Sequence, residues 1–282
     1  MRTSGGEGDL TTPLVSVVTP VYNGARYIEG AIQSVLAQNY PHVEHMLMDG
    51  GSRDGTLGIL TRYSSDHPGR IRFVSEPDRG PGDAWNKGLK MSRGDVLTCI
   101  GADDICEAGA IQAVVDFFNS HPGAFFVHGE CDLINSRGEI IGRHKVEDFN
   151  LNTFVNTAKY IATPSAYYKR CVLERVGWLD SSGDDFDLMI RIAREFRIHK
   201  LDRVLSKLRL HADSAFNPTD LQQRINLYRQ TYRVSRRYGG HILSPIALRY
   251  YCGLVFGWLG LGAPFSAMRR LFRILRGLPG RI

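Results

Sequence analysis

Long hydrophobic runs and paired cysteines are both missing from this sequence. The first dozen residues, Met1 to Thr12, hold no apolar segment of the kind a signal peptide needs, so we interpret residues 1–12 as a disordered N-terminal tail. The apolar stretch after Ser244 is broken by glycines and falls short of the roughly 18 to 20 residues that cross a bilayer. The five cysteines are odd in number, and no pair has metal-ligand spacing. We therefore expect a reducing, cytoplasmic compartment.

Two nucleotide-binding signatures are missing as well. The turns that follow the apolar runs contain neither a G-x-G-x-x-G pattern nor a G-x-x-x-x-G-K-[ST] pattern. The sequence therefore supports neither a dinucleotide-binding fold nor a P-loop.

Acidic residues are missing from the end of the chain. No Asp or Glu follows Asp220, whereas 11 of the 35 basic residues, all of them arginines, lie beyond it. Such a segment favours an anionic surface. Apolar residues and arginines recur at helical spacing after Pro264, which fits a helix lying in a membrane interface. A helical hairpin that packs on the rest of the protein, or on a second subunit, is the alternative for this basic, helical region, residues 217–282.

What the first half does contain is a regular alternation of apolar runs and amphipathic segments. Val15 to Pro20, Val43 to Met48, Ile71 to Val74 and Val96 to Ile100 are typical of strands, and helical spacing follows the first three. This alternation predicts an α/β fold, a mostly parallel sheet flanked by helices, with a C-terminal helical appendage. Because ligands bind at the carboxyl ends of such strands, the polar turns there should share one cleft.

Two adjacent carboxylates, Asp103 and Asp104, follow the fourth predicted strand directly after Gly101 and Ala102. Oxygen ligands of this kind suit Mg²⁺ or Mn²⁺, especially when a diphosphate completes the coordination shell. A helix N-cap is the alternative for an Asp at a strand-to-helix turn.

A second acidic cluster lies about 80 residues further on. Asp184, Asp185 and Asp187 begin a segment whose apolar residues have helical spacing. The helix dipole favours negative charge at this end, so capping is again the alternative. Three carboxylates within four positions nevertheless exceed what a cap needs.

In their order along the chain, these motifs resemble the family 2 glycosyltransferases of the GT-A fold, over about Pro13 to Phe216. The resemblance implies that residues 13–216 form the catalytic domain. The matching segments are Val17-Val18-Thr19-Pro20-Val21-Tyr22-Asn23, Asp49-Gly50-Gly51-Ser52, Asp78-Arg79-Gly80, Asp83-Ala84-Trp85-Asn86, Ala102-Asp103-Asp104, Val176-Gly177-Trp178-Leu179-Asp180, Asp184-Asp185-Phe186-Asp187-Leu188 and Arg209-Leu210-His211.

The resemblance implies inverting sugar transfer from a nucleotide-sugar donor, a UDP-sugar first of all, to a saccharide or lipid-linked saccharide acceptor. It places a Mg²⁺ or Mn²⁺ ion on Asp104, Asp103 and His211. The catalytic base is Asp185, with Asp184 as the alternative. The residues implied to bind the nucleotide sugar are Pro20, Tyr22, Asp49, Arg79, Asp83 and Asp103.

Two positions depart from the family pattern. Gly50 stands where many relatives carry a second Asp that reads the nucleobase, and Asp184 stands where a Glu is usual. No Gln-x-x-Arg-Trp motif is present, so nothing points to a processive synthase. We expect a role in cell-surface polysaccharide or glycolipid assembly, in the cytoplasm or peripherally on the inner face of the cytoplasmic membrane.

Two other classes of protein are alternatives to this interpretation. A nucleotidyltransferase needs a Gly-rich, Lys-bearing loop near its N-terminus, and the sequence has none. The Arg-rich end suggests a nucleic-acid-binding protein, but its aromatic residues follow no recognised binding motif, so no nucleic-acid partner is expected.

Overall fold

A computed structural model describes residues 12–158, 161–179, 185–211 and 221–258 of the chain. The chain divides into two compact units. The first comprises Met1–Phe154 with Lys159–His211, and the second comprises Val155–Ala158 with Ala212–Ile282.

The first half of the first unit follows the predicted alternation of strands and helices. β1 lies between β2 and β4 and pairs with both in parallel, and β3 pairs in parallel with the outer side of β2. These elements are β1 (Val15–Val21), α1 (Ile28–Leu36), β2 (Val43–Asp49), α2 (Thr56–Asp66), β3 (Ile71–Ser75), α3 (Pro81–Met91) and β4 (Val96–Cys99).

The second half adds strands that extend the same sheet. β8 pairs antiparallel with both β4 and β6, so the sheet is mixed beyond β4, whereas the sequence predicts mostly parallel pairing. The strand order is β3-β2-β1-β4-β8-β6-β9-β5, with β7 on β6. The added elements are β5 (Ile105–Cys106), α4 (Ala110–Ser120), β6 (Phe126–Ile134), β7 (Ile140–His144), α5 (Leu151–Thr157), η1 (Thr163–Ser165), β8 (Ala166–Lys169), α6 (Arg170–Val176), α7 (Asp185–Glu195) and β9 (Ile198–Arg209).

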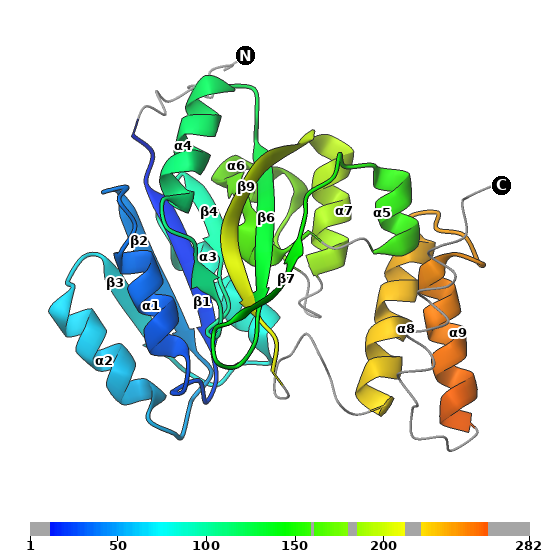
Figure 1. Ribbon diagram of the computed structural model, residues 1–282, viewed down its shortest axis with the longest axis horizontal. Helices are drawn as coiled ribbons and strands as arrows, with labels where there is room; N and C mark the ends of the chain where they lie inside the picture. The colour runs from blue at the N-terminus through cyan, green and yellow to red at the C-terminus, as the bar shows by residue number, and fades with distance from the viewer. Residues whose placement is uncertain (1–11, 159–160, 180–184, 212–220, 259–282) are drawn as a thin grey trace, which may run out of the picture. The chain divides into compact units, whose positions relative to one another are not determined.

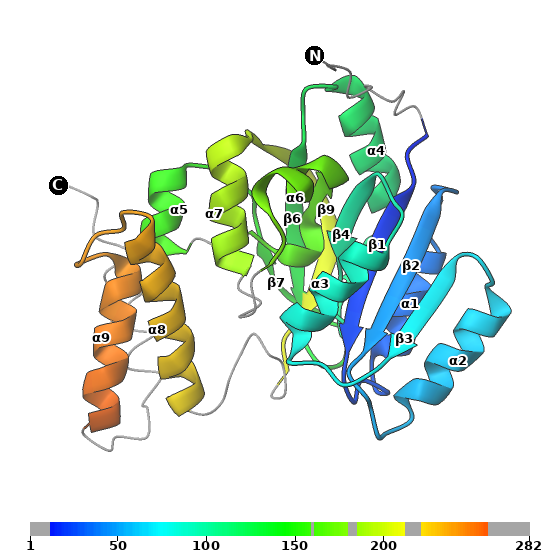
Figure 2. The ribbon, with the colours of Figure 1, turned by 180° about the vertical axis from the view of Figure 1, so that it is seen from behind.

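Helices cover both faces of this sheet, which explains why β1 and β2 are buried along almost their whole length (Figures 1 and 2). Val17 and Val21 of β1 belong to apolar clusters that also include buried residues of α1, α2 and α4. On the other face α3 lies close to the sheet, since a Cβ at Gly88 would be 2.4 Å from Val18 Cγ1. The predicted α/β fold class is confirmed.

The second unit contains two long helices, α8 (Leu221–Arg237) and α9 (Pro245–Trp258). The Tyr232 ring stacks on Tyr250, and its hydroxyl lies 2.8 Å from that of Tyr251. The backbone N–H of His241 donates to Asn156 Oδ1, which ties the turn between the helices to the short segment of α5 in this unit. Within the described parts of the chain, no helix is long and apolar enough to cross a membrane.

Candidate active site

The candidate site lies where β1, β2 and β4 end at the same edge of the sheet. Val21 lies opposite Asp49 in the parallel register, and Val18 lies opposite Cys99. The backbone N–H of Ile100 donates to Val18 O and continues this pairing by one residue. The segment that carries Asp103 and Asp104 therefore begins beside the end of the central strand, as the sequence predicts.

Gly101 determines the shape of the acidic turn. A Cβ at this position would lie 2.6 Å from Asp104 Oδ2 and 2.9 Å from Asp103 Oδ1. The two carboxylates therefore fold back over the Gly101 backbone. No side chain fits beneath them unless the carboxylates move.

The end of β9 holds both carboxylates in place. The backbone N–H of Arg209 donates to Asp104 Oδ1 at 2.9 Å, and its Nε donates to the Asp103 carbonyl oxygen at 2.8 Å. His211 follows two residues later, and its Nε2 lies 2.9 Å from Asp103 Oδ2. The structure thus brings together Asp103, Asp104 and His211, which the resemblance assigns to the metal.

The surroundings of Asp104 disfavour its ionised form. Burial raises the pKa of Asp104 to about 8, and the negative charge of Asp103 adds to this effect. Hydrogen bonds from the Arg209 and Gly101 backbones act in the opposite direction but do not outweigh burial. A nearby divalent cation would favour the ionised form of both carboxylates.

The donor set fits a hard cation that shares its shell with a ligand. Two carboxylates and an imidazole are ligands that Mn²⁺ or Mg²⁺ accepts. Among the residues the structure describes, no group of three or more His, Cys, Asp or Glu side chains could hold a metal ion by itself.

Tyr27 lies under this cluster and was not predicted as a site residue. Its ring centroid is 5.0 Å from that of His211, and the Arg209 guanidinium carbon lies 4.8 Å from the Tyr27 centroid. In the sequence Tyr27 only precedes the first helix, so no local pattern connects it with residues about 180 positions away.

The second acidic cluster approaches the same point from α7. Thr163 Oγ1 donates to Asp185 Oδ2 at 2.9 Å. Burial raises the pKa of the Cys99 thiol well above the usual value, and the charges of Asp104 and Asp185 raise it further. Asp104 and Asp185 are thus both close enough to affect one thiol. Asp184 lies outside the described residues.

Asp187 points away from this point and has a structural partner. Its Oδ2 accepts a hydrogen bond from Arg191 Nε at 2.8 Å. The other guanidinium nitrogens of Arg191 donate to the carbonyl oxygens of Val176, Gly177 and Trp178. The next carbonyl, that of Leu179, accepts from Asn86 Nδ2 of α3 at 3.2 Å.

At the end of β2, Asp49 is only 2% exposed and stabilises its own loop. Its carboxylate accepts from the backbone N–H groups of Gly51 and Ser52 and from the Ser75 hydroxyl. A Cβ at Gly50 would lie 2.5 Å from Asp78 Oδ2, so the Asp78 carboxylate occupies the space of a side chain at position 50.

The remaining predicted nucleotide-binding residues surround this loop. Pro20 lies in β1, and Tyr22, one residue beyond β1, is 63% exposed. Arg79 and Asp83 form an ion pair at 3.1 Å at the start of α3. The hydrogen bonds from Arg79 lower the pKa of Asp83, which keeps this carboxylate charged.

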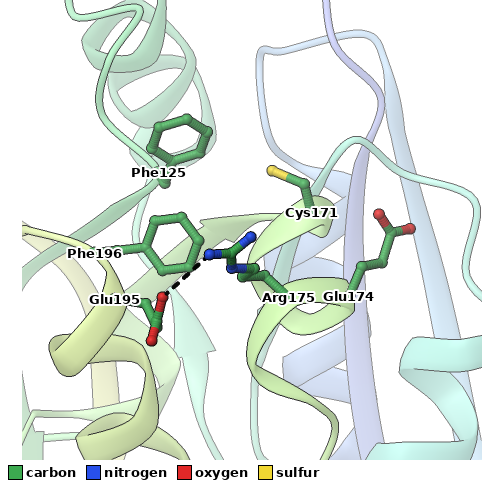
Figure 3. Close-up of a pocket in the computed structure, with 6 residues that line it drawn as sticks. All are labelled: Phe125, Cys171, Glu174, Arg175, Glu195 and Phe196. Carbon is green, nitrogen blue, oxygen red and sulfur yellow. Dashed lines mark ion pairs between the residues drawn. The ribbon is translucent and has the colours of Figure 1, made fainter. Parts of the chain in front are cut away.

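A separate cavity of about 500 Å³ lies away from these residues, between α6, α7 and the segment before β6 (Figure 3). It is lined by Phe125, Cys171, Glu174, Arg175, Glu195 and Phe196. The backbone N–H of Arg170, at the start of α6, donates to the carbonyl of Asp95, which directly precedes β4. The cavity therefore lies near the opposite edge of the sheet and contains none of the predicted site residues.

The fold, and an acidic site at this edge of the sheet, define a glycosyltransferase of the GT-A type. Residues 16–175 match the model of Glycosyl transferase family 2, which is more than half of the chain, and the protein belongs to this family. The expected family and fold are thereby confirmed.

Curated relatives and solved structures agree with this assignment. An uncharacterised glycosyltransferase from Rickettsia conorii is 29% identical over 210 residues, which cover 71% of this chain and 34% of the relative. Chondroitin synthase from Escherichia coli is 33% identical over 129 residues, or 46% of this chain and 19% of that protein. This chain thus spans about a third and a fifth of the length of these two relatives.

Two solved structures share the fold. The mannosyltransferase PcManGT from Pyrobaculum calidifontis, in complex with GDP-Man and Mn²⁺, has a TM-score of 0.60 at 20% identity, covering 93% of this chain and 80% of that one. Residues 1–349 of TarS from S. aureus, in complex with UDP-GlcNAc, have a TM-score of 0.60 at 17% identity, covering 84% and 71%.

Proposed function

We propose that this protein is a metal-dependent, inverting glycosyltransferase that moves a sugar from a nucleotide-sugar donor to an acceptor hydroxyl. The observation that carries the proposal is a pair of acidic groups on separate elements, Asp104 after β4, held by the Arg209 backbone, and Asp185 at the start of α7, held by Thr163. One group suits a cation at a leaving diphosphate, and the other suits a proton acceptor on the incoming hydroxyl.

On the donor side, Asp103, Asp104 and His211 hold Mg²⁺ or Mn²⁺. When bound, the ion neutralises the charge that develops on the leaving nucleoside diphosphate. Pro20, Tyr22, Asp49, Arg79 and Asp83 surround the nucleoside, and Asp103 also contacts the ribose. The UDP-GlcNAc and GDP-Man complexes of the two structural neighbours support a nucleotide-sugar donor, and the Mn²⁺ of PcManGT supports the metal.

On the acceptor side, Asp185 takes the proton of the hydroxyl as its oxygen attacks the anomeric carbon from the face opposite the diphosphate. The C–O bond to the diphosphate breaks as the new glycosidic bond forms, so no covalent enzyme intermediate is needed. The carboxylate acts as a general base, an effect worth about 10²- to 10⁴-fold in rate.

The test is a paired substitution of the two carboxylates. Asp185→Asn should lower turnover by about 10²- to 10⁴-fold and leave Mn²⁺-dependent UDP binding unchanged, because the donor is held by other elements. Asp104→Ala should abolish that binding as well as turnover. UDP release and calorimetry measure the two effects. If Asp185→Asn keeps turnover within a few-fold of the wild type, the proposed base is wrong.

For the acceptor, we propose a saccharide or lipid-linked saccharide used in cell-surface polysaccharide or glycolipid assembly. The similarity to chondroitin synthase, whose name describes a polysaccharide-forming enzyme, supports this class. We further propose that the protein works at the inner face of the cytoplasmic membrane, through its basic C-terminal region.

Exposed apolar side chains in the second unit support this membrane contact. In the turn between α8 and α9, Ile242 is 57% exposed and Leu243 is 74% exposed, and α9 exposes Leu248 and Val255. The neighbouring helix exposes Arg233 and Arg236, and no acidic residue follows Asp220 in the sequence. Exposed apolar side chains next to arginines match the interface of an anionic bilayer.

Full-length protein should sediment with phosphatidylserine-containing liposomes at low salt. The double variant Ile242→Asp/Leu243→Asp should stay largely in the supernatant, because each lost apolar side chain is worth about 1.5 to 3 kcal/mol of burial. Ile140→Asp/Ile141→Asp is the matched control: it places the same charges at the exposed start of β7. Equal sedimentation of all three proteins would remove the membrane from the proposal.

A further inference from the structure

Thr163 carries a function that the sequence motifs do not assign. It begins η1, the short turn before β8, and its side chain reaches the first residue of α7, where Thr163 Oγ1 donates to Asp185 Oδ2 at 2.9 Å. The two residues are 22 positions apart in the chain. Their contact joins the proposed base to a different element of the fold.

The η1 turn is held by interior strands of the sheet. Ser165, in the same turn, is fully buried, and its hydroxyl donates to the carbonyl oxygen of Glu130 in β6 at 2.9 Å. The same hydroxyl lies 2.6 Å from that of Ser206 in β9. The position of Thr163 is therefore set by two interior strands. Thr is also β-branched, so its hydroxyl has few directions available.

The neighbours of Asp185 in α7 have partners of their own. Within α7, Asp187 pairs with Arg191, and Phe186 packs its ring against Phe154 at 5.0 Å. Thr163 brings a hydroxyl donor from a rigid part of the sheet to the carboxylate itself.

We propose that Thr163 is a positioning residue that holds one oxygen of the Asp185 carboxylate and thereby aims the carboxylate at the acceptor hydroxyl. This inference rests on the proposed function, in which Asp185 is the base. A general base must lie within hydrogen-bond reach of the proton that it takes, and small misplacements are costly. A hydrogen bond donated to a carboxylate also favours its ionised, proton-accepting form.

The test compares Thr163→Val, which keeps the shape but loses the hydroxyl, with Thr163→Ser, which keeps the hydroxyl. Release of the nucleoside diphosphate is followed against pH with Mn²⁺ and whichever of UDP-GlcNAc, UDP-glucose and GDP-mannose gives the largest Mn²⁺-dependent thermal shift. In Thr163→Val, kcat should fall about 10- to 100-fold and the acid limb of its pH profile should move up by about one unit. The KM and the Kd of Mn²⁺-UDP should stay within about twofold, and Thr163→Ser should retain most of the wild-type kcat.

The outcomes separate this inference from the proposed function. Asp185→Asn is measured in parallel, and adding Thr163→Val to it should cause little further loss, because both changes disable one unit. If Asp185→Asn is inactive while Thr163→Val keeps its kcat and its pH profile, only the positioning role fails. If Thr163→Val unfolds or loses Mn²⁺-UDP binding, Thr163 is structural and the inference is overturned. If Asp185→Asn retains turnover, the proposed base itself is wrong.

Discussion

The two acidic clusters of this protein look alike in the sequence and differ in the structure. Both place adjacent or nearly adjacent carboxylates at the boundary of an element. In the first, residues at the end of β9 contact both carboxylates: Arg209 contacts Asp104, and His211 contacts Asp103. In the second, Asp185, the proposed base, contacts Thr163, while Asp187 is held by Arg191. The partner of a carboxylate, and not its spacing, separates a chemical role from a structural one.

The largest expected effect on stability tests the structural side of this comparison. Asp187 is buried and the Arg191 side chain is only 22% exposed, so Asp187→Ala removes the carboxylate from a largely enclosed ion pair and should lower the free energy of unfolding by about 3 kcal/mol. Urea denaturation measures the loss. Turnover below the unfolding transition should change only a few-fold, the reverse of the result expected for Asp185→Asn. Equal losses of turnover in both variants would erase the distinction between them.

A smaller effect is expected from the glycine under the first cluster. Gly101→Ala places a Cβ within 2.6 Å of Asp104 Oδ2 and forces the carboxylates apart. Mn²⁺-dependent UDP binding, measured by calorimetry, should weaken by about 10- to 100-fold, as for other changes that misplace metal ligands. Gly58→Ala in α2 is the matched control, because no atom outside its own helix backbone lies within 4 Å of the added Cβ. Equal binding by the two variants would contradict the described geometry.

The smallest effect concerns His45, a buried histidine that belongs to neither acidic cluster. Burial lowers the pKa of His45 in β2 to about 3, against 6.5 in the unfolded chain. As the pH falls below 6.5, the unfolded chain binds a proton that the folded protein does not, so stability is lost. Protonation of His45 in the unfolded chain should lower the free energy of unfolding by about 2 kcal/mol between pH 7 and pH 5. His45→Gln should reduce that loss in urea titrations, and substitution of the exposed His121 should not.

The parallel half of the sheet could be predicted from the sequence because its signal is local. A polar turn and a segment with helical spacing follow each of the first three apolar runs. The order of the elements, and the edge of the sheet that carries Asp103 and Asp104, can therefore be predicted from residues that are neighbours in the chain. The helical spacing predicted after Ile71 to Val74 corresponds to α3, which buries Trp85 and Leu89.

The remaining half depends on contacts between distant segments. The antiparallel pairing of β8 with β4 joins residues about 70 positions apart, and no short pattern encodes it. The same limit applies to the site. Asp104 depends on Arg209, which is 105 positions away, and Asp185 depends on Thr163, which lies in a different element. Their residue types alone do not reveal these pairs.

Hydrogen bonds connect one short segment to two helices through the carbonyl oxygens of Val176, Gly177, Trp178 and Leu179. Arg191 in the middle of α7 holds the first three carbonyls, and Asn86 in the middle of α3 holds the fourth. Asp83 lies in the first turn of α3, and Asp185 lies in the first turn of α7. Sliding of either helix along the sheet would stretch these hydrogen bonds, so residues 176–179 connect the helix that begins near Asp83 to the helix that begins with Asp185.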